Sequence, residues 1–194
     1  MNRFSSLGLL AGTIAMVAAT APASAAPSYH ARGTDGVFWF LHLSDSHIGT
    51  EWYPDADDHF RFALEQGVSV IKPWFVVVTG DLCDGSRAGI PTSGQDQKEW
   101  DLYRQIYQGA GMTSDFYFDL PGNHDGYGDV GMRSYLANSM QGSTNNALYA
   151  SWVAQTPVGN YYFFGLNSAG DGSGPAFEDP EFTADEIADL EEGL

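Results

Sequence analysis

Three short polar clusters in this 194-residue chain carry the side chains of metal ligands. They are Asp45-Ser46-His47, then Gly80-Asp81-Leu82-Cys83-Asp84, and then Gly122-Asn123-His124-Asp125. Carboxylate, imidazole and amide groups bind hard or borderline cations. The neighbouring glycines let the backbone turn sharply and come close to an ion. We therefore expect a metal site if the fold brings the three clusters together.

Each cluster directly follows a segment with the pattern of a buried strand. The expected strands are residues 37–43, 74–79 and 116–120, which are rich in apolar side chains. Short apolar runs of this kind are typical of strands buried on both faces. One helix is expected from about Asp55 to Pro73, and another over residues 97–108. Because parallel strands of an α/β sheet end at a common edge, the clusters should converge there.

The rest of the chain is predicted to continue this layered fold. A short helix is expected within residues 130–140, followed by two antiparallel strands over residues 147–153 and 160–166. Thr183 and Glu186 have the spacing of a capping box at the start of a final helix. We expect the acidic side chains of residues 185–192 in solvent, and an apolar stripe made of Ile187, Leu190 and Leu194.

Composition and the N-terminus limit the class of protein. The chain has 25 acidic and 8 basic residues, a net charge of −17, and one cysteine, Cys83. This charge opposes non-specific binding to nucleic acid or anionic lipid. A single cysteine forms no intrachain disulfide, and we expect a packed thiol.

The first 25 residues predict a signal peptide. They combine a short basic start, an apolar stretch and a small-residue cleavage site at Ala25. An uncleaved anchor helix is the alternative. We expect residues 26–36 as a flexible lead-in, no membrane segment in the mature chain, and export to a periplasm or the medium.

Each polar cluster by itself has a simpler explanation. Asp45 and His47 could lie in a solvated turn, and Gly80-Asp81 is a common turn at the end of a strand. Residues 122–125 could simply supply left-handed turn residues. Three such clusters in order, each at the end of a strand, favour a metal site instead.

The ordered clusters resemble those of the calcineurin-like metallophosphoesterases. The Asp-x-His, Gly-Asp-x-x-Asp and Gly-Asn-His-Asp/Glu blocks of that family are all present without substitution. The resemblance spans residues 37–194 and implies an α/β fold, a β-sandwich flanked by helices in αββα layers, incomplete at the C-terminus. Two local features are similar to the phosphoesterase domain of transmembrane protein 62 relatives: Glu99-Trp100-x-x-Tyr103 and Thr156-Pro157-x-Gly159-Asn160-Tyr161.

The resemblance implies a dinuclear centre of two divalent or trivalent transition-metal ions, such as Mn, Fe or Zn. In that pattern Asp45 and His47 bind the first metal, Asp81 bridges both, and Asn123 binds the second. Two cations of this kind clamp a phosphoryl group and activate a bridging hydroxide that attacks phosphorus. The implied activity is hydrolysis of a phosphate mono- or diester on a small-molecule or macromolecular substrate.

The same resemblance assigns roles to residues beside these ligands. It implies that His124 contacts the substrate phosphoryl group as proton donor or charge stabiliser, while Asp125 orients its ring. Asp84 is implied to hydrogen-bond beside the metals rather than to bind them. Trp52 and Tyr53 could wall the substrate site or pack in the core or at the rim.

The family pattern continues with a lone histidine and Gly-His-x-His, but no histidine follows His124 in this chain. Of the other histidines, His30 lies in the lead-in, His42 is expected in the buried core, and His59 in solvent. We therefore expect the chain to be the N-terminal part of a longer enzyme. The alternatives are a short natural protein with a half-formed site, and a non-catalytic binding module on the same fold.

Overall fold

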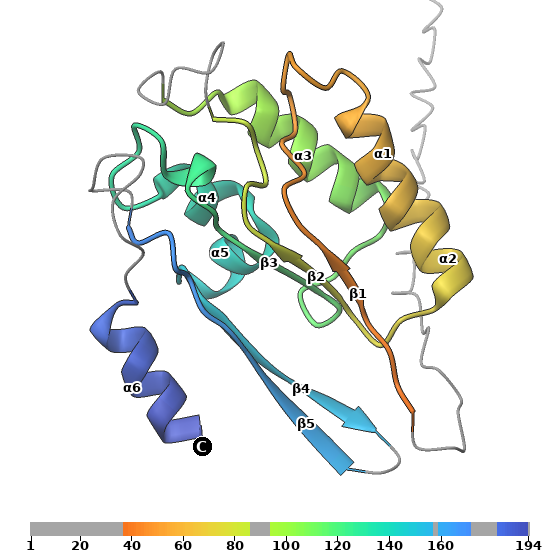
Figure 1. The fold of residues 1–194 in the computed structure, drawn as a ribbon, viewed down its shortest axis with the longest axis vertical. Coiled ribbons are helices and arrows are strands. Elements are labelled where there is room, and N and C mark those ends of the chain that lie inside the picture. Colours follow the sequence, from red (N-terminus) through yellow and green to blue (C-terminus); the bar gives the residue numbers. More distant parts are fainter. Residues whose placement is uncertain (1–36, 86–93, 157–158, 172–181, 194) are drawn as a thin grey trace, which may run out of the picture.

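The computed structural model describes residues 37–85, 94–156, 159–171 and 182–193 (Figure 1). The strands form a parallel sheet of β1 (Leu41–Leu43), β2 (Val76–Thr79) and β3 (Tyr117–Leu120), and an antiparallel hairpin of β4 (Ala150–Thr156) and β5 (Gly159–Gly165). The longer helices are α1 (Ala56–Phe62), α2 (Val68–Ile71), α3 (Gln97–Gly109), α4 (Arg133–Asn138), α5 (Met140–Asn145) and α6 (Ala184–Gly193). The expected strand–helix alternation and the antiparallel pair are both confirmed.

The parallel sheet has β2 at its centre, between β1 and β3. Val77 pairs with His42 on one side and with Phe118 on the other. β1 is shorter than the expected strand over residues 37–43, because it lies at the edge of the sheet. There the carbonyl of Trp39 still accepts a hydrogen bond of 2.9 Å from the N–H of Trp74, beyond the end of the regular ladder.

The helix that connects β1 to β2 runs from α1 to α2 through a π-helical turn, η1 (Ala63–Gly67). It ends at Lys72, whose φ of 52° lies in the left-handed region. Pro73 follows, and a proline disfavours the helical conformation in the residue before it. The predicted end of this helix is therefore confirmed.

The segment after the third polar cluster forms two short helices where the sequence predicted one. Ser139 separates α4 from α5 with an extended backbone, and its hydroxyl accepts a hydrogen bond of 2.9 Å from the N–H of Gly142. A serine cap of this kind satisfies a free N–H at the start of a helix. The cap at Ser139 therefore starts a new helix, α5, instead of continuing α4.

Side-chain alternation along β2 divides the molecule into layers. Val76 and Val78 pack in the core under α1 to α5, whereas Phe75 and Val77 face the β4–β5 hairpin. The hairpin contributes Trp152, whose ring stacks on Phe118 at 4.1 Å. On its other side, Gly193 of α6 lies against the ring of Phe164. The order of layers is helices, parallel sheet, hairpin, helix, which is the expected αββα arrangement (Figure 1).

The last helix differs in its buried face from the prediction. The capping box is confirmed, since the Glu186 carboxylate accepts hydrogen bonds of 2.8 Å from both the N–H and the hydroxyl of Thr183. The same carboxylate accepts one of 2.6 Å from the N–H of Asn167 and is fully buried. Ile187, expected in the apolar stripe, is 47% exposed. The expectation that residues 185–192 all face solvent is therefore wrong at Glu186, because its carboxylate satisfies three donors.

Two histidines test the expected environments. His59 is exposed, as predicted. His42 is exposed rather than buried, because β1 is an edge strand; its Nε2 lies 2.8 Å from the hydroxyl of Thr79. The expected core position of His42 is wrong, although its side chain is hydrogen-bonded.

The N-terminal expectations stay predictions. The signal peptide over residues 1–25 and the lead-in over residues 26–36 lie outside the described residues. Among the helices of the described segments, none has the length and apolar character needed to cross a bilayer.

Candidate metal centre

The loops after β1 and β2 run side by side beyond the end of the sheet. The N–H of Asp45 donates to the carbonyl of Gly80 over 3.1 Å, and the N–H of His47 donates to the carbonyl of Asp81 over 2.9 Å. One bridge further on pairs Ile48 with Cys83. The parallel ladder thus continues into the first two polar clusters and aligns them.

Two glycines allow the second and third clusters to approach each other. Gly80 has a φ of +82°, and a Cβ on it would lie 3.0 Å from the Cα of Gly122. A Cβ on Gly122 would collide with the backbone and the carboxylate of Asp81. A larger residue at Gly122 would therefore push the third cluster away from Asp81.

Asp45, His47 and Asp81 form a compact group of possible metal ligands. Each offers one ligand atom, and the three atoms lie within 4.8 Å of one another. His47 Nε2 lies 3.7 Å from Asp81 Oδ2, with the side chains 24% and 13% exposed. A cation could therefore reach this group from solvent.

The backbone at these three residues is in an uncommon conformation. Their φ angles are 55°, 42° and 49° for Asp45, His47 and Asp81. Positive φ is costly for residues other than glycine and tends to concentrate at functional sites. The three side chains from these positions bring their possible ligand atoms within 4.8 Å of one another.

Asp81 is held from two directions. Its Oδ1 accepts a hydrogen bond of 3.0 Å from the N–H of His124, while its Oδ2 faces His47. The carboxylate thus lies between the first cluster and the third.

Asn123 follows on the third cluster, at the start of the short helix η3 (His124–Gly126). Its side chain is exposed, and its Nδ2 donates to the hydroxyl of Tyr127 over 2.8 Å. The amide oxygen, which is the possible ligand atom, lies on the other branch of the same group.

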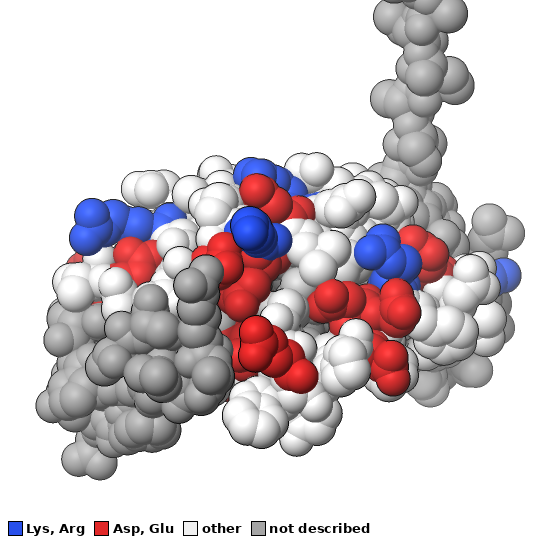
Figure 2. All heavy atoms as spheres, turned by 90° about the horizontal axis from the view of Figure 1, so that it is seen from above, with Lys and Arg blue, Asp and Glu red and all other residues white. Residues whose placement is uncertain are grey.

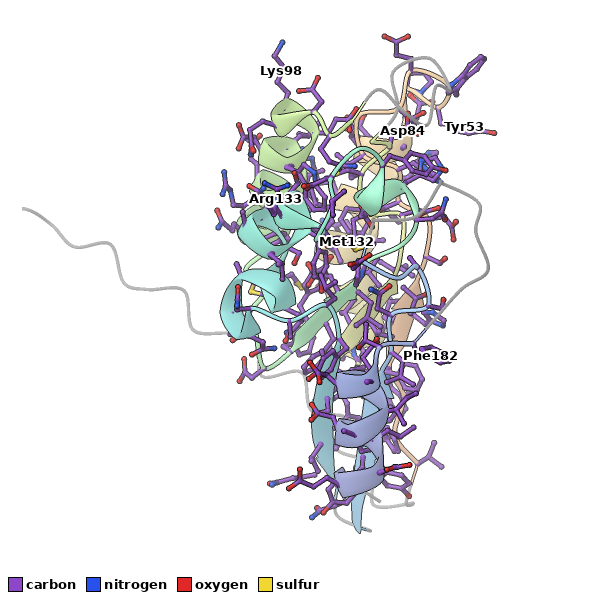
Figure 3. All side chains as sticks on the ribbon, turned by 90° about the vertical axis from the view of Figure 1, so that its left-hand side faces the viewer. Tyr53, Asp84, Lys98, Met132, Arg133 and Phe182 are labelled. Atoms are coloured by element: carbon purple, nitrogen blue, oxygen red, sulfur yellow. The ribbon has the colours of Figure 1, made fainter. Side chains whose placement is uncertain are left out.

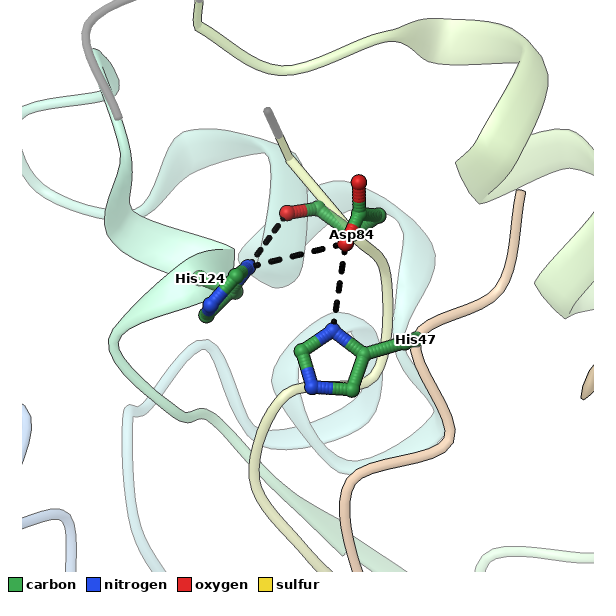
Figure 4. Close-up of side chains that lie close together, drawn as sticks. All are labelled: His47, Asp84 and His124. Carbon is green, nitrogen blue, oxygen red and sulfur yellow. Dashed lines mark hydrogen bonds and ion pairs between the residues drawn. The ribbon is translucent and has the colours of Figure 1, made fainter. Parts of the chain in front are cut away.

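Asp84 lies between two histidine rings (Figure 4). Its Oδ1 is 3.3 Å from Nδ1 of His47, and its backbone oxygen is 2.6 Å from Nδ1 of His124. The two rings meet edge to face, with centroids 4.5 Å apart. Carboxylate and carbonyl oxygens only accept here, so both Nδ1 atoms carry protons. The Nε2 atom of each neutral ring then keeps its lone pair.

Asp125 has a different role from the one that the resemblance implied. Its carboxylate is fully buried and accepts hydrogen bonds from the N–H groups of Leu82, Cys83 and Gly122 at 3.1, 3.1 and 2.8 Å. Burial raises its pKa to about 7. The expectation that Asp125 orients the ring of His124 is wrong, because Asp84 makes that contact. Asp125 instead joins the second cluster to the third.

Several residues that support the site were not assigned to it from the sequence. Gln95 donates from Nε2 to the carbonyls of His124 at 2.8 Å and Tyr127 at 3.1 Å, and its Oε1 accepts from Trp100 at 2.9 Å. Glu99 accepts from the N–H of Gly85 over 3.0 Å. Glu99 and Trp100 belong to a local motif that is visible in the sequence, but only the structure shows that Trp100 is linked through Gln95 to the third cluster.

The surroundings of the site are acidic and include exposed aromatic side chains. Figure 2 shows acidic side chains gathered on the face seen from above. Trp52 and Tyr53 are 67% and 71% exposed, which excludes core packing for them, and Tyr53 is drawn at the same end of the molecule as Asp84 (Figure 3). Cys83 is fully buried, and burial raises the pKa of its thiol, so the predicted packed thiol is confirmed.

Comparison with known proteins decides the family. The family model described as calcineurin-like phosphoesterase matches residues 38–183. The chain belongs to the calcineurin-like phosphoesterase family.

Two curated relatives of this phosphoesterase chain are consistent with that assignment. An Arabidopsis thaliana protein with metallophosphoesterase in its name is 26% identical over 149 residues, covering 71% of this chain and 20% of that protein. Transmembrane protein 62 of Mus musculus is 27% identical over 142 residues, covering 69% of this chain and 21% of that protein. The chain thus spans about a fifth of the length of these relatives.

The donors of this phosphoesterase chain fit the divalent metal ions that the family uses. Asp45, His47 and Asp81 supply two carboxylates and an imidazole within 4.8 Å. Nδ1 of His47 is held by Asp84, which leaves Nε2 for a cation. A second described group, His47 with Asp84 and His124, is equally compact. Its Nδ1 atoms are engaged with Asp84, so it is better suited to orienting the rings than to binding an ion.

Proposed function

We propose that this protein hydrolyses phosphate mono- or diesters at a centre of two transition-metal ions, Mn, Fe or Zn. The observation that carries the proposal is the convergence of Asp45, His47 and Asp81 within 4.8 Å, beside His124. In this proposal Asp45 and His47 hold the first cation, Asp81 is shared, and Asn123 holds the second. The cations, when bound, supply Lewis-acid activation of water and neutralise charge on the phosphoryl group.

His124 is proposed to act on the phosphoryl group through Nε2. Its Nδ1 is engaged by the Asp84 carbonyl at 2.6 Å, so Nε2 is the ring nitrogen left to face a substrate. The side chain is 22% exposed, which lets a substrate reach it. A positioned imidazole can donate a proton to a leaving oxygen or stabilise charge on it.

The acidic character of the chain bears on the substrate. With a net charge of −17, the protein repels a phosphate ester in the absence of cations. Metal ions at Asp45, His47 and Asp81 would offset this charge where the ester binds. The substrate is proposed to be a phosphorylated small molecule or macromolecule, without non-specific binding to nucleic acid.

The proposal is tested by hydrolysis of an aryl phosphate and a bis-aryl phosphate by the full-length protein, with each metal in turn. Activity should disappear on exhaustive chelation and return with metal. Asp81→Asn should abolish it, whereas Asp58→Asn, at an exposed carboxylate on α1, should leave it unchanged. Full activity after chelation, or in Asp81→Asn, would refute the proposal. Binding of metal and phosphate without turnover would support the non-catalytic binding module instead.

A further inference from the structure

Tyr127 lies against the third polar cluster without belonging to the set of proposed ligands. It follows η3 directly and is only 4% exposed. Its ring lies 4.5 Å from the ring of His124, at an angle of 41°. The buried Tyr127 ring therefore packs against His124, which is proposed to act on the substrate.

The hydroxyl of Tyr127 also contacts the neighbouring proposed ligand. It lies 2.8 Å from Nδ2 of Asn123, which donates the hydrogen bond. An amide group has donors on one branch and an acceptor on the other. The Tyr127 hydroxyl accepts from the NH₂ branch in this structure, which directs the Oδ1 branch away from the tyrosine.

Tyr127 is itself held by the backbone. Its N–H donates to the carbonyl of His124 over 3.2 Å, and its carbonyl accepts from Gln95 Nε2 over 3.1 Å. Gln95 is in turn bonded to Trp100, whose side chain is fully buried on α3. The hydroxyl thus reaches Asn123 from a rigid support, which is what an outer hydrogen-bonding partner needs in order to orient a ligand.

We propose that Tyr127 is a positioning residue that orients the Asn123 amide oxygen toward a metal ion and supports the ring of His124. The inference rests on the proposed metal centre, because it concerns how this chain presents one of its ligands. The hydroxyl and the ring make separate contacts, to Asn123 and to His124, so the two effects can be separated by substitution.

Metal titration of the 194-residue chain tests the hydroxyl contact. Tyr127→Phe keeps the ring and removes only the hydroxyl. It should weaken binding at the site that uses Asn123 by about ten- to a hundredfold. Tyr53→Phe removes a hydroxyl from a side chain that is 71% exposed and should change nothing. Thermal unfolding of the metal-free chains shows whether Tyr127→Phe folds like the wild type.

A double substitution separates positioning from a general structural effect. If Tyr127 acts through Asn123, then Tyr127→Phe should have no further effect on metal affinity in an Asn123→Ala background. Equal weakening in both backgrounds, or none in the wild-type background, would overturn the inference. A wild-type chain that binds no metal would refute the proposed centre itself. If the wild type binds metal and Tyr127→Phe binds it just as tightly, only the role of Tyr127 would be refuted.

Discussion

Nδ1 of His124 donates a hydrogen bond of 2.6 Å to the backbone carbonyl of Asp84, which lies 40 residues earlier. Because this acceptor belongs to the backbone, no substitution at residue 84 that keeps the loop in place removes it. Because a carbonyl oxygen only accepts, Nδ1 is the donor, and Nε2 is the ring nitrogen left to act on a substrate.

This relationship predicts how His124→Ala will behave. Turnover should fall by about 10²- to 10⁴-fold, the usual contribution of a general acid or base. Metal content should stay near that of the wild type, since both Nδ1 of His124 and its backbone bonds serve the loops rather than a cation. Turnover and metal content measured on the same samples decide this. Loss of both ions would reassign His124 as a ligand.

The Asp84 side chain gives a different expectation. Its Oδ1 lies 3.3 Å from Nδ1 of His47, and this contact would orient the ring that is proposed to bind the first cation. Asp84→Asn should weaken the first cation by about ten- to a hundredfold, as is usual for such outer partners. Competition with a metal-sensitive dye measures the affinity, and Asp101→Asn, at an exposed carboxylate, is the control. Unchanged affinity in Asp84→Asn would mean that the ring is oriented without this carboxylate.

The two cations should differ in affinity for this chain. In the proposed centre, Asp45 and His47 would hold the first cation together with Asp81, whereas the second would have only Asp81 and the Asn123 amide. The second site has fewer charged donors and leaves more coordination positions to water, so the second cation should bind more weakly than the first. Calorimetric titration of the 194-residue chain checks this. Two equally tight ions per chain would contradict it.

The raised pKa of Asp125 should make the stability of the metal-free protein fall as the pH rises. Its pKa is raised from 3.8 to about 7, chiefly by burial. Between these values the folded protein binds more protons than the unfolded chain does, so raising the pH favours unfolding. The carboxyl should contribute a loss of up to about 4 kcal/mol in unfolding free energy from pH 4 to pH 7.

Denaturant unfolding of wild type and Asp125→Asn across this range measures that contribution. The wild type should lose more stability with rising pH than the variant does, because asparagine has no proton to release. Parallel stability profiles would show that Asp125 does not titrate in this window. Both proteins are kept free of metal, since a nearby cation favours the carboxylate and lowers its pKa.

Substitution of Glu186 should lower the stability of the fold without removing a residue of the proposed site. Its carboxylate accepts from Thr183 and from the N–H of Asn167, so it ties α6 to the segment that follows β5. Glu186→Ala leaves the buried N–H of Asn167 and the half-buried donors of Thr183 without this partner, at a cost of about 1–3 kcal/mol. Glu191→Ala, at an exposed position of α6, should cost almost nothing. Denaturant unfolding measures both variants, and equal stability would show that the buried carboxylate is dispensable.

Local sequence patterns predicted the elements that carry the site. The apolar runs before Asp45, Asp81 and Asn123 contain the strands β1, β2 and β3. They could be recognised because a strand buried on both faces needs a continuous run of apolar side chains. The parallel order then placed all three clusters at one edge of the sheet. Pro73 and the Thr183–Glu186 capping box marked helix ends, since these act through the backbone of adjacent residues. The exposure of His42 and the burial of Glu186 depend on packing and were missed, and the local serine cap that splits the helix at Ser139 was not anticipated either.

The sequence by itself therefore determined the family, the residue types of the candidate metal site and the layers that position it. Only the tertiary structure decided which residue supports which, because those contacts join loops about 40 residues apart in the chain. It assigned Asp84 to His124 and gave Asp125 to the backbone N–H groups of Leu82 and Cys83. Periodicity and composition carry no information on such pairings, since each depends on the direction in which a folded loop presents one side chain to another.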